Sequence, residues 1–278
     1  LYKLFIKKLK IKKFSEAVYF KTSRRMSVIP SLRNFSDIIS SFDNHRFFGT
    51  ATSLLEKRFG IINKVDKKLI LNSLEDRKSF IEFLKKFQNS ILKNALYEKR
   101  NYKKYLSTIM NKKEKIIISD QGFNGSVQTS LEKITNLQFY GLYMSLKEKV
   151  KNRDKSYKNG FYTYGGNFTN LNHIFESVFT APHGTFINFD GKKFYKEKKM
   201  TNQKLFNIKK KIFFGVQKYF EETIKLEKNI DNLEIKNKFP DEIFGFFNKE
   251  KIIIKQNLLK SFYFDNSYVR EGENKISF

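Results

Sequence analysis

Cysteine is absent from the chain, and histidine occurs only at His45, His173 and His183. The first absence excludes disulfides and thiolate metal sites, and three imidazoles argue against a structural zinc site. We therefore expect no metal and no cofactor. No apolar run approaches the roughly 18–20 residues that cross a bilayer, and no signal peptide is recognisable, so a cytoplasmic location is the default expectation.

Acidic residues are also in deficit. The 278 residues carry 55 Lys and Arg against 28 Asp and Glu, a formal net charge of +27. A high positive charge favours binding to the phosphate backbone of nucleic acids. Nearly all of the excess is lysine, however, which is poorer than arginine at bidentate recognition of bases or phosphates. We expect mainly a lysine-coated surface, with nucleic acid an unlikely partner. An anionic partner, namely a nucleotide sugar, a lipid phosphate or nucleic acid, stays open as the alternative.

A strand–loop–helix pattern occupies residues 116–134. The apolar run Ile116–Ser119 is typical of a short buried strand, and Val127, Leu131 and Ile134 then fall on one face of a helix. The start of a helix favours anions, and glycines in the loop let a phosphate approach the backbone. The pattern predicts a phosphate-binding site at Asp120, Gly122, Asn124, Gly125, Ser126 and Gln128. In the alternative interpretation, Asp120 and Ser126 only cap the helix.

Four segments resemble motifs of one bacterial family. Asp120–Gln128, DQGFNGSVQ, is similar to D-x-G-[FW]-N-G-[ST]-x-Q, and Tyr19–Leu32 is similar to Y-x-x-S-R-[RK]-[AS]-L-x-x-P. Phe175–Ile187 resembles [FL]-E-x-x-F-[ST]-A-P-H-[GP]-S, and Phe214–Phe220 resembles I-x-x-G-[AV]-x-x-F. The family comprises large proteins of capsule and lipopolysaccharide clusters, usually identified as predicted hydrolases of the haloacid dehalogenase (HAD) superfamily.

The resemblance implies a role in bacterial surface-polysaccharide biosynthesis. The HAD motifs of the family, including the nucleophile in D-x-[FY]-D-T and a late G-D-N, are absent from this sequence. The resemblance therefore implies the C-terminal, post-HAD region of such a protein. Its expected partners are a phosphorylated sugar or nucleotide-sugar, the missing N-terminal HAD-like domain and, peripherally, membrane glycan machinery. Whether this region is an enzyme stays open.

Two further segments supply candidate site residues. Ala17–Phe20 is predicted as a strand ending at Ser23, Arg24 and Arg25, where open parallel sheets bind ligands and arginine can clamp a phosphate. The alternative is a salt bridge to an acidic neighbour such as Asp120. His183, after a proline, and Glu176 are the candidate catalytic acid and base. The alternative for His183 is a turn residue that bonds to the backbone.

The order of strand and helix patterns predicts an α/β fold, with a small, mostly parallel, Rossmann-like sheet flanked by helices and a helical C-terminal part. We expect an α/β domain over residues 1–190 and a mainly helical extension over 191–278. A long helical insertion is predicted at about 74–110, with a capping arrangement at Ser73 and Asp76. A shorter helix is predicted to end at Gly60.

Two other function classes remain open. A glycosyltransferase-like enzyme usually carries a metal-binding D-x-D, which is absent from the sequence, although metal-independent transfer stays possible. A basic nucleic-acid- or lipid-binding module would need its lysines clustered on one face of the molecule.

Overall fold

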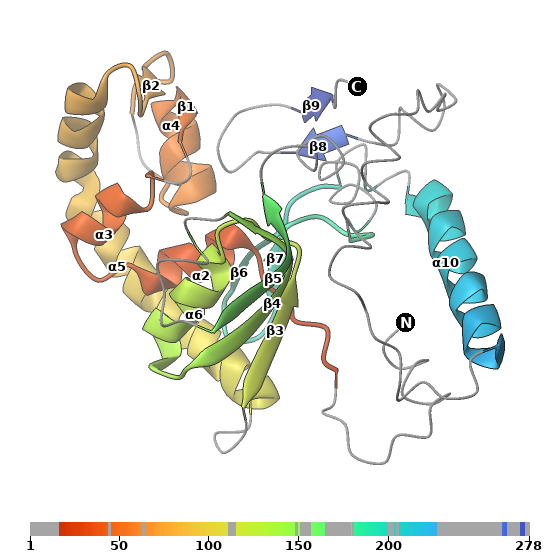
Figure 1. Cartoon of the computed structure of the whole chain (residues 1–278). Helices are drawn as coiled ribbons and strands as arrows, with labels where there is room; N and C mark the ends of the chain where they lie inside the picture. Colours follow the sequence, from red (N-terminus) through yellow and green to blue (C-terminus); the bar gives the residue numbers. More distant parts are fainter. Residues whose placement is uncertain are drawn as a thin grey trace.

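The computed structural model describes residues 17–43, 46–62, 65–110, 115–147, 150, 157–164, 179, 181–199, 203, 206–226, 263–265 and 273–275. Within them, a three-stranded parallel sheet is flanked by helices, which confirms an α/β fold with a parallel sheet (Figure 1). Its strands, in spatial order, are β3 (Ile116–Asp120), β4 (Phe139–Lys147) and β5 (Lys158–Tyr164).

Helices pack on one face of this sheet. The connection from β3 to β4 is α6 (Ser126–Thr135), which packs against α2 (Arg24–Ser31), and both pack against the 33-residue α5 (Arg77–Ile109). The hairpin of β6 (Phe186–Phe189) and β7 (Phe194–Lys196) contacts α2 and α5.

Shorter elements complete the described fold. Helix α3 (Phe35–Ser40) precedes the antiparallel pair of β1 (Phe48–Thr50) and β2 (Ile70–Asn72). Between these strands lie α4 (Ala51–Ser53) and the π-helical turn η1 (Leu54–Arg58). Near the C-terminus lie α10 (Phe206–Leu226) and the antiparallel pair of β8 (Tyr263–Asp265) and β9 (Glu273–Lys275). No helix among the described residues is both long and apolar enough to cross a membrane.

Two predicted boundaries are corrected by hydrogen bonds. Residues 17–22 form no strand, because the backbone N–H of Lys21 donates to the Tyr105 hydroxyl (2.8 Å) instead of to a neighbouring strand. Helix α5 is capped by Asp76, whose carboxylate accepts from the N–H of Ser79, whereas the Ser73 hydroxyl accepts from the N–H of Phe47. The expected stop at Gly60 is confirmed, since Gly60 follows η1 with a φ of +67°.

Helix α5 links two hydrophobic clusters. Its first half, from Phe80 to Ala95, packs into a cluster with α3, α4 and η1. Its second half, from Tyr102 to Leu106, packs into a cluster with α6, β4 and β6. Since one unbroken helix contributes to both clusters, α5 is part of the core on which the sheet rests.

A buried ion pair lies at the junction of the two clusters. Arg25 and Glu98 are 5% and 4% exposed, and the guanidinium donates to both carboxylate oxygens (Nη2–Oε1 2.8 Å, Nη1–Oε2 3.2 Å). Arg25 also donates from Nε to the carbonyl of Lys57 (2.9 Å) and from Nη1 to that of Ile187. Asn94 donates to Glu98 Oε1 and to the carbonyl of Phe59. This network joins α2, η1, α5 and β6.

Removing either partner of this pair should therefore strongly destabilise the fold. Glu98→Ala leaves the guanidinium buried without its counter-ion, and we expect a loss of about 3–5 kcal/mol in the free energy of unfolding. The exposed pair Arg77–Asp43 (3.4 Å) is the control, and Asp43→Ala should cost less than about 1 kcal/mol. Urea titration followed by circular dichroism measures both, and equal losses would contradict this role.

Gly60 and Gly215 should respond oppositely to alanine. A Cβ at Gly60 would lie 2.5 Å from Arg25 Nη2, and its φ of +67° is strained for alanine, so Gly60→Ala should cost more than about 1 kcal/mol. A Cβ at Gly215, within α10, meets nothing within 4 Å, so Gly215→Ala should stabilise by about 0.5–1 kcal/mol. Melting temperatures of the two variants, compared with the parent, test the contrast.

Candidate functional site

The strand–loop–helix site is built by the parallel unit of β3, α6 and β4. The register pairs Ile116 with Phe139 and Asp120 with Tyr143, so the loop at 121–125 leaves the carboxyl end of β3. This loop stays attached to β4, because the N–H groups of Ser145 and Lys147 donate to the carbonyls of residues 121 and 123. The carboxyl edge of a parallel sheet is where open α/β folds bind ligands.

Gly125 begins α6 in a conformation that suits glycine. Its φ of 58° and ψ of 28° are left-handed, and no side chain caps the helix at this position. The alternative in which Asp120 and Ser126 cap the helix is therefore wrong. A Cβ at Gly125 would lie 2.9 Å from Lys158 Cδ and 3.1 Å from Tyr143 Oη. The first turn of α6 thus keeps its positive end without a capping side chain, beside a lysine from β5.

Gln128 has a structural role, because its side chain joins α6 to β4. It is fully buried, its Nε2 donates to the carbonyl of Phe139 (2.8 Å) and to Glu132 Oε1 (3.1 Å), and its Oε1 accepts from the Tyr143 hydroxyl (2.8 Å). The prediction that Gln128 contacts a ligand is corrected, since both ends of its amide bind within the fold. Burial, and then the carboxylates of Asp120 and Glu132, raise the pKa of Tyr143, which keeps it a hydrogen-bond donor.

Three groups of different chemistry surround the loop. Asp120 is exposed at the end of β3, and its Oδ2 would lie 2.9 Å from a Cβ at Gly122. On the other side, Lys158 Nζ donates to Thr129 Oγ1 (2.9 Å) in the first turn of α6. The Oδ1 atom of Asn124 is buried without a hydrogen-bond partner among the described residues. The exposed carboxylate can accept hydrogen bonds from hydroxyls, and the ammonium group can bind a phosphate.

The segment Ser23–Arg25 meets the segment after His183. Ser23 is the N-cap of α2, accepting from the N–H of Met26 (3.0 Å) and donating to the carbonyl of Phe186 (2.6 Å). The expectation that Arg25 clamps a ligand is corrected, because Glu98 and two backbone carbonyls engage its guanidinium. Arg24 forms no ion pair with a described residue.

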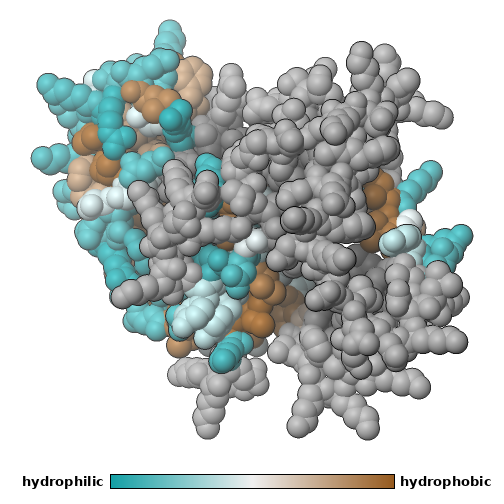
Figure 2. Space-filling model, viewed as in Figure 1, coloured by the Kyte–Doolittle hydropathy of each residue, from teal (hydrophilic) through white to brown (hydrophobic). Residues whose placement is uncertain are grey.

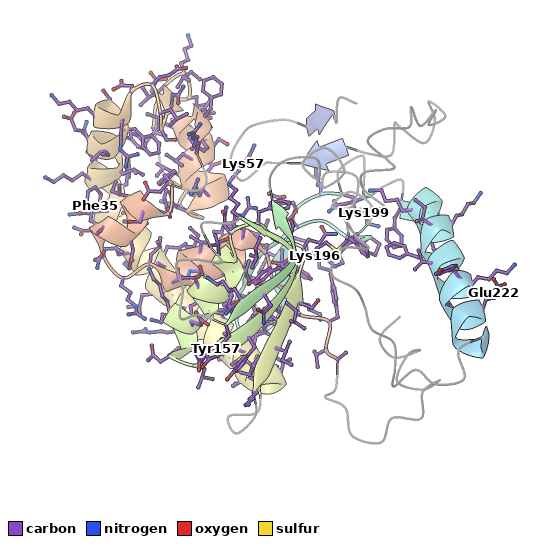
Figure 3. All side chains as sticks on the ribbon, in the orientation of Figure 1. Phe35, Lys57, Tyr157, Lys196, Lys199 and Glu222 are labelled. Carbon is purple, nitrogen blue, oxygen red and sulfur yellow. The ribbon has the colours of Figure 1, made fainter. Side chains whose placement is uncertain are left out.

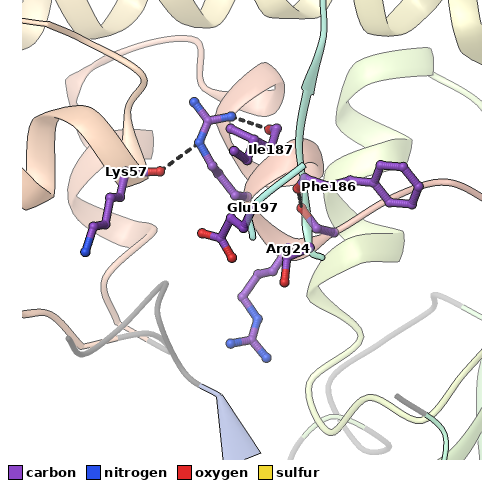
Figure 4. A pocket seen from close by; sticks show the side chains of 8 residues that line it. Arg24, Lys57, Phe186, Ile187 and Glu197 are labelled. Carbon is purple, nitrogen blue, oxygen red and sulfur yellow. Dashed lines mark hydrogen bonds between the residues drawn. The ribbon is translucent and has the colours of Figure 1, made fainter. Parts of the chain in front are cut away.

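A cavity lies at this junction. It encloses about 50 Å³, well below the roughly 300–1,000 Å³ of small-molecule pockets, so it holds at most a few waters or a small anion. Its lining comes from the start of α2, from η1, from the start of β6 and from the residue after β7 (Figure 4): Ser23, Arg24, Arg25, Lys57, Thr185, Phe186, Ile187 and Glu197. The sequence predicted two separate candidate segments here but not their contact.

His183 is engaged at both ring nitrogens. Nδ1 lies 2.9 Å from the carbonyl oxygen of Gly184 and Nε2 lies 2.8 Å from the Tyr19 hydroxyl. Because a carbonyl only accepts, we assign the proton to Nδ1, and Nε2 then accepts from Tyr19. His183 thereby ties residues 17–22 to the hairpin, which fits the predicted alternative of a turn residue bonded to backbone. Glu176 lies outside the described residues.

The N-terminal ends of α2 and α6 face the same side of the sheet. The two helices pack against each other, and their C-terminal ends meet where Arg33 donates to the carbonyl of Lys133 and Lys133 pairs with Asp37 (3.0 Å). Because α2 and α6 are of similar length, their N-terminal ends lie toward the carboxyl edge of β3.

Comparison with known proteins adds no family to this description. No protein-family model matches the sequence, and no curated protein matches it.

Tyr143 and Gln128 should behave as one unit. Tyr143→Phe removes the donor to a fully buried amide oxygen, and we expect it to cost about 1–2 kcal/mol of unfolding free energy. Gln128→Leu should cost at least as much, because it also leaves the Phe139 carbonyl unpaired. A double-mutant cycle measured by urea unfolding should give a coupling above about 0.5 kcal/mol. Additive losses would show that the two side chains act independently.

Proposed function

We propose that this chain binds a phosphorylated sugar or nucleotide-sugar at the loop of residues 120–128. The observation that carries the proposal is the uncapped start of α6 at the carboxyl edge of a parallel strand, with Gly125 left-handed and Lys158 beside it. Backbone N–H groups, the helix dipole and the ammonium group all favour a phosphate there.

The sugar portion of the ligand has its own partners in this proposal. The exposed Asp120 carboxylate accepts hydrogen bonds from sugar or ribose hydroxyls. Arg24, the first residue of α2, contributes positive charge for a second phosphate in this proposal. Gln128 and Tyr143 hold α6 against β4 and do not contact the ligand.

The process that we propose is bacterial surface-polysaccharide biosynthesis in the cytoplasm. It is supported by the resemblance of Asp120–Gln128 to the capsule and lipopolysaccharide family, since the residues that resemble the motif form the loop and helix start. The unit of β3, α6, β4 and β5 supports a Rossmann-like sheet as the finer fold assignment. In this proposal the part of the chain around α10 is a helical extension.

Thermal-shift measurements with three ligands test the binding site. At millimolar concentrations, a nucleotide sugar, a sugar 1-phosphate or inorganic phosphate should raise the melting temperature of the parent by about 2–4 °C. Lys158→Gln should reduce the shift with every phosphate-bearing ligand. Asp120→Ala should reduce it only for ligands that carry a sugar, because phosphate does not use the carboxylate.

Glu75→Ala and Lys67→Gln are the matched controls, since both remove an exposed charge far from α6 along the chain. They should keep every shift. The proposal is contradicted if no ligand stabilises the parent, or if the Asp120 and Lys158 variants respond as the controls do.

A further inference from the structure

The exposed face of α5 carries a stripe of positive charge, and we propose that this stripe docks on an anionic lipid surface. The proposal concerns a different element from the loop of residues 120–128 and does not depend on ligand binding there. We call these seven exposed residues the α5 basic stripe: Lys78, Lys85, Lys86, Lys93, Arg100, Lys103 and Lys104.

The stripe follows from the helical spacing of these residues. At 3.6 residues per turn they fall within about a third of the helix circumference, opposite the buried face that includes Leu84, Ile91 and Tyr102. From Lys78 to Lys104 the stripe is about 39 Å long at 1.5 Å per residue. Hydrophilic side chains gather along the side of the molecule where α5 runs (Figure 2).

Little negative charge interrupts the stripe. Glu82 is the only exposed acidic residue of α5, since Glu98 is buried against Arg25. The pKa of Lys99, at the side of the stripe, is lowered first by partial burial and then by the cations of Arg33 and Lys103. Cations held this close together repel one another, and an anionic surface would relieve that repulsion.

The lysine-rich composition does not by itself produce such a face. On α10, Glu222 (Figure 3) lies 3.9 Å from the exposed Lys218 and directly follows Glu221, so acidic side chains accompany lysine on that helix. The two long helices therefore differ in charge pattern although they share the same bias toward lysine.

Two exposed apolar side chains favour a lipid surface over nucleic acid. Leu96 and Tyr97 are 50% and 55% exposed; Leu96 lies within the stripe and Tyr97 borders it. A tyrosine and a leucine flanked by lysines suit the boundary between headgroups and acyl chains, where tyrosine is enriched. Lysine side chains act as point charges that are attracted to an anionic membrane surface. Bidentate recognition of individual phosphates would instead favour arginine.

Vesicle co-sedimentation of the full chain is the first test. The chain should bind phosphatidylcholine vesicles that contain phosphatidylglycerol and should not bind pure phosphatidylcholine. The triple variant Lys86→Gln, Lys93→Gln, Arg100→Gln should partition about 100-fold less, at about 5-fold for each cation removed near an anionic membrane. The matched control Lys210→Gln, Lys211→Gln, Lys218→Gln removes the same charge from α10 and should change partitioning less than 5-fold.

A fluorescent probe then reports which residue meets the lipid. The chain contains no tryptophan, so Tyr97→Trp introduces a single one. Its emission should shift to the blue with anionic vesicles, whereas Tyr219→Trp on α10, at a position that is 72% exposed, should show no shift.

Three results would overturn the proposal. Absence of binding to anionic vesicles would do so, as would equal losses in the two triple variants, which would mean that only total charge matters. The third result is that the stripe triple variant loses the binding to duplex DNA that the parent shows, while neither the parent nor this variant binds anionic vesicles. That result would make the stripe a nucleic-acid surface.

Discussion

The buried pair of Arg25 and Glu98 is the constraint on which the rest of the described fold depends. An ion pair in a protein interior gives little net stability, but it allows only one arrangement of its partners. Here the partners fix α2 to α5, and the remaining Arg25 donors fix η1 and β6 to the same point. The pair also demands glycine at position 60, where a Cβ would meet the guanidinium.

The candidate site follows from that arrangement. With α2 held on α5, α6 packs against α2 and is positioned on the sheet, and Gln128 then fixes its first turns to β4. The loop at 121–125 is therefore held by buried contacts on its inner side, while Asp120 is exposed on its outer side. A preorganised loop of this kind loses little freedom when a ligand binds. The α5 basic stripe lies on another element, so a lipid surface and a sugar ligand need not compete.

Local patterns predicted much of this fold. The apolar run at residues 116–119, the helical spacing of Val127, Leu131 and Ile134, and the stop at Gly60 correspond to β3, α6 and the end of η1. The run was predicted as a buried strand, and this is wrong, because β3 is an edge strand in which Ile117 is 57% exposed. Features that depend on distant partners could not be predicted. Glu98 is 73 residues from Arg25, so no local pattern links them, and Lys21 bonds to a tyrosine 84 residues away, which removes the expected strand. Lys158 was missed because only the parallel register brings it beside Gly125.

Amide chemical shifts measured by NMR test directly whether the loop of residues 120–128 binds the phosphate of a sugar ligand. When a sugar 1-phosphate is titrated into the ¹⁵N-labelled chain, we predict the largest, saturable shifts at Gly122, Gly125 and Ser126, with smaller ones at Asp120. Shifts centred on Thr185 and Arg24 would place the ligand in the cavity beside α2 instead. Shifts confined to the lysines of α5, or none at all, would contradict phosphate binding at this loop.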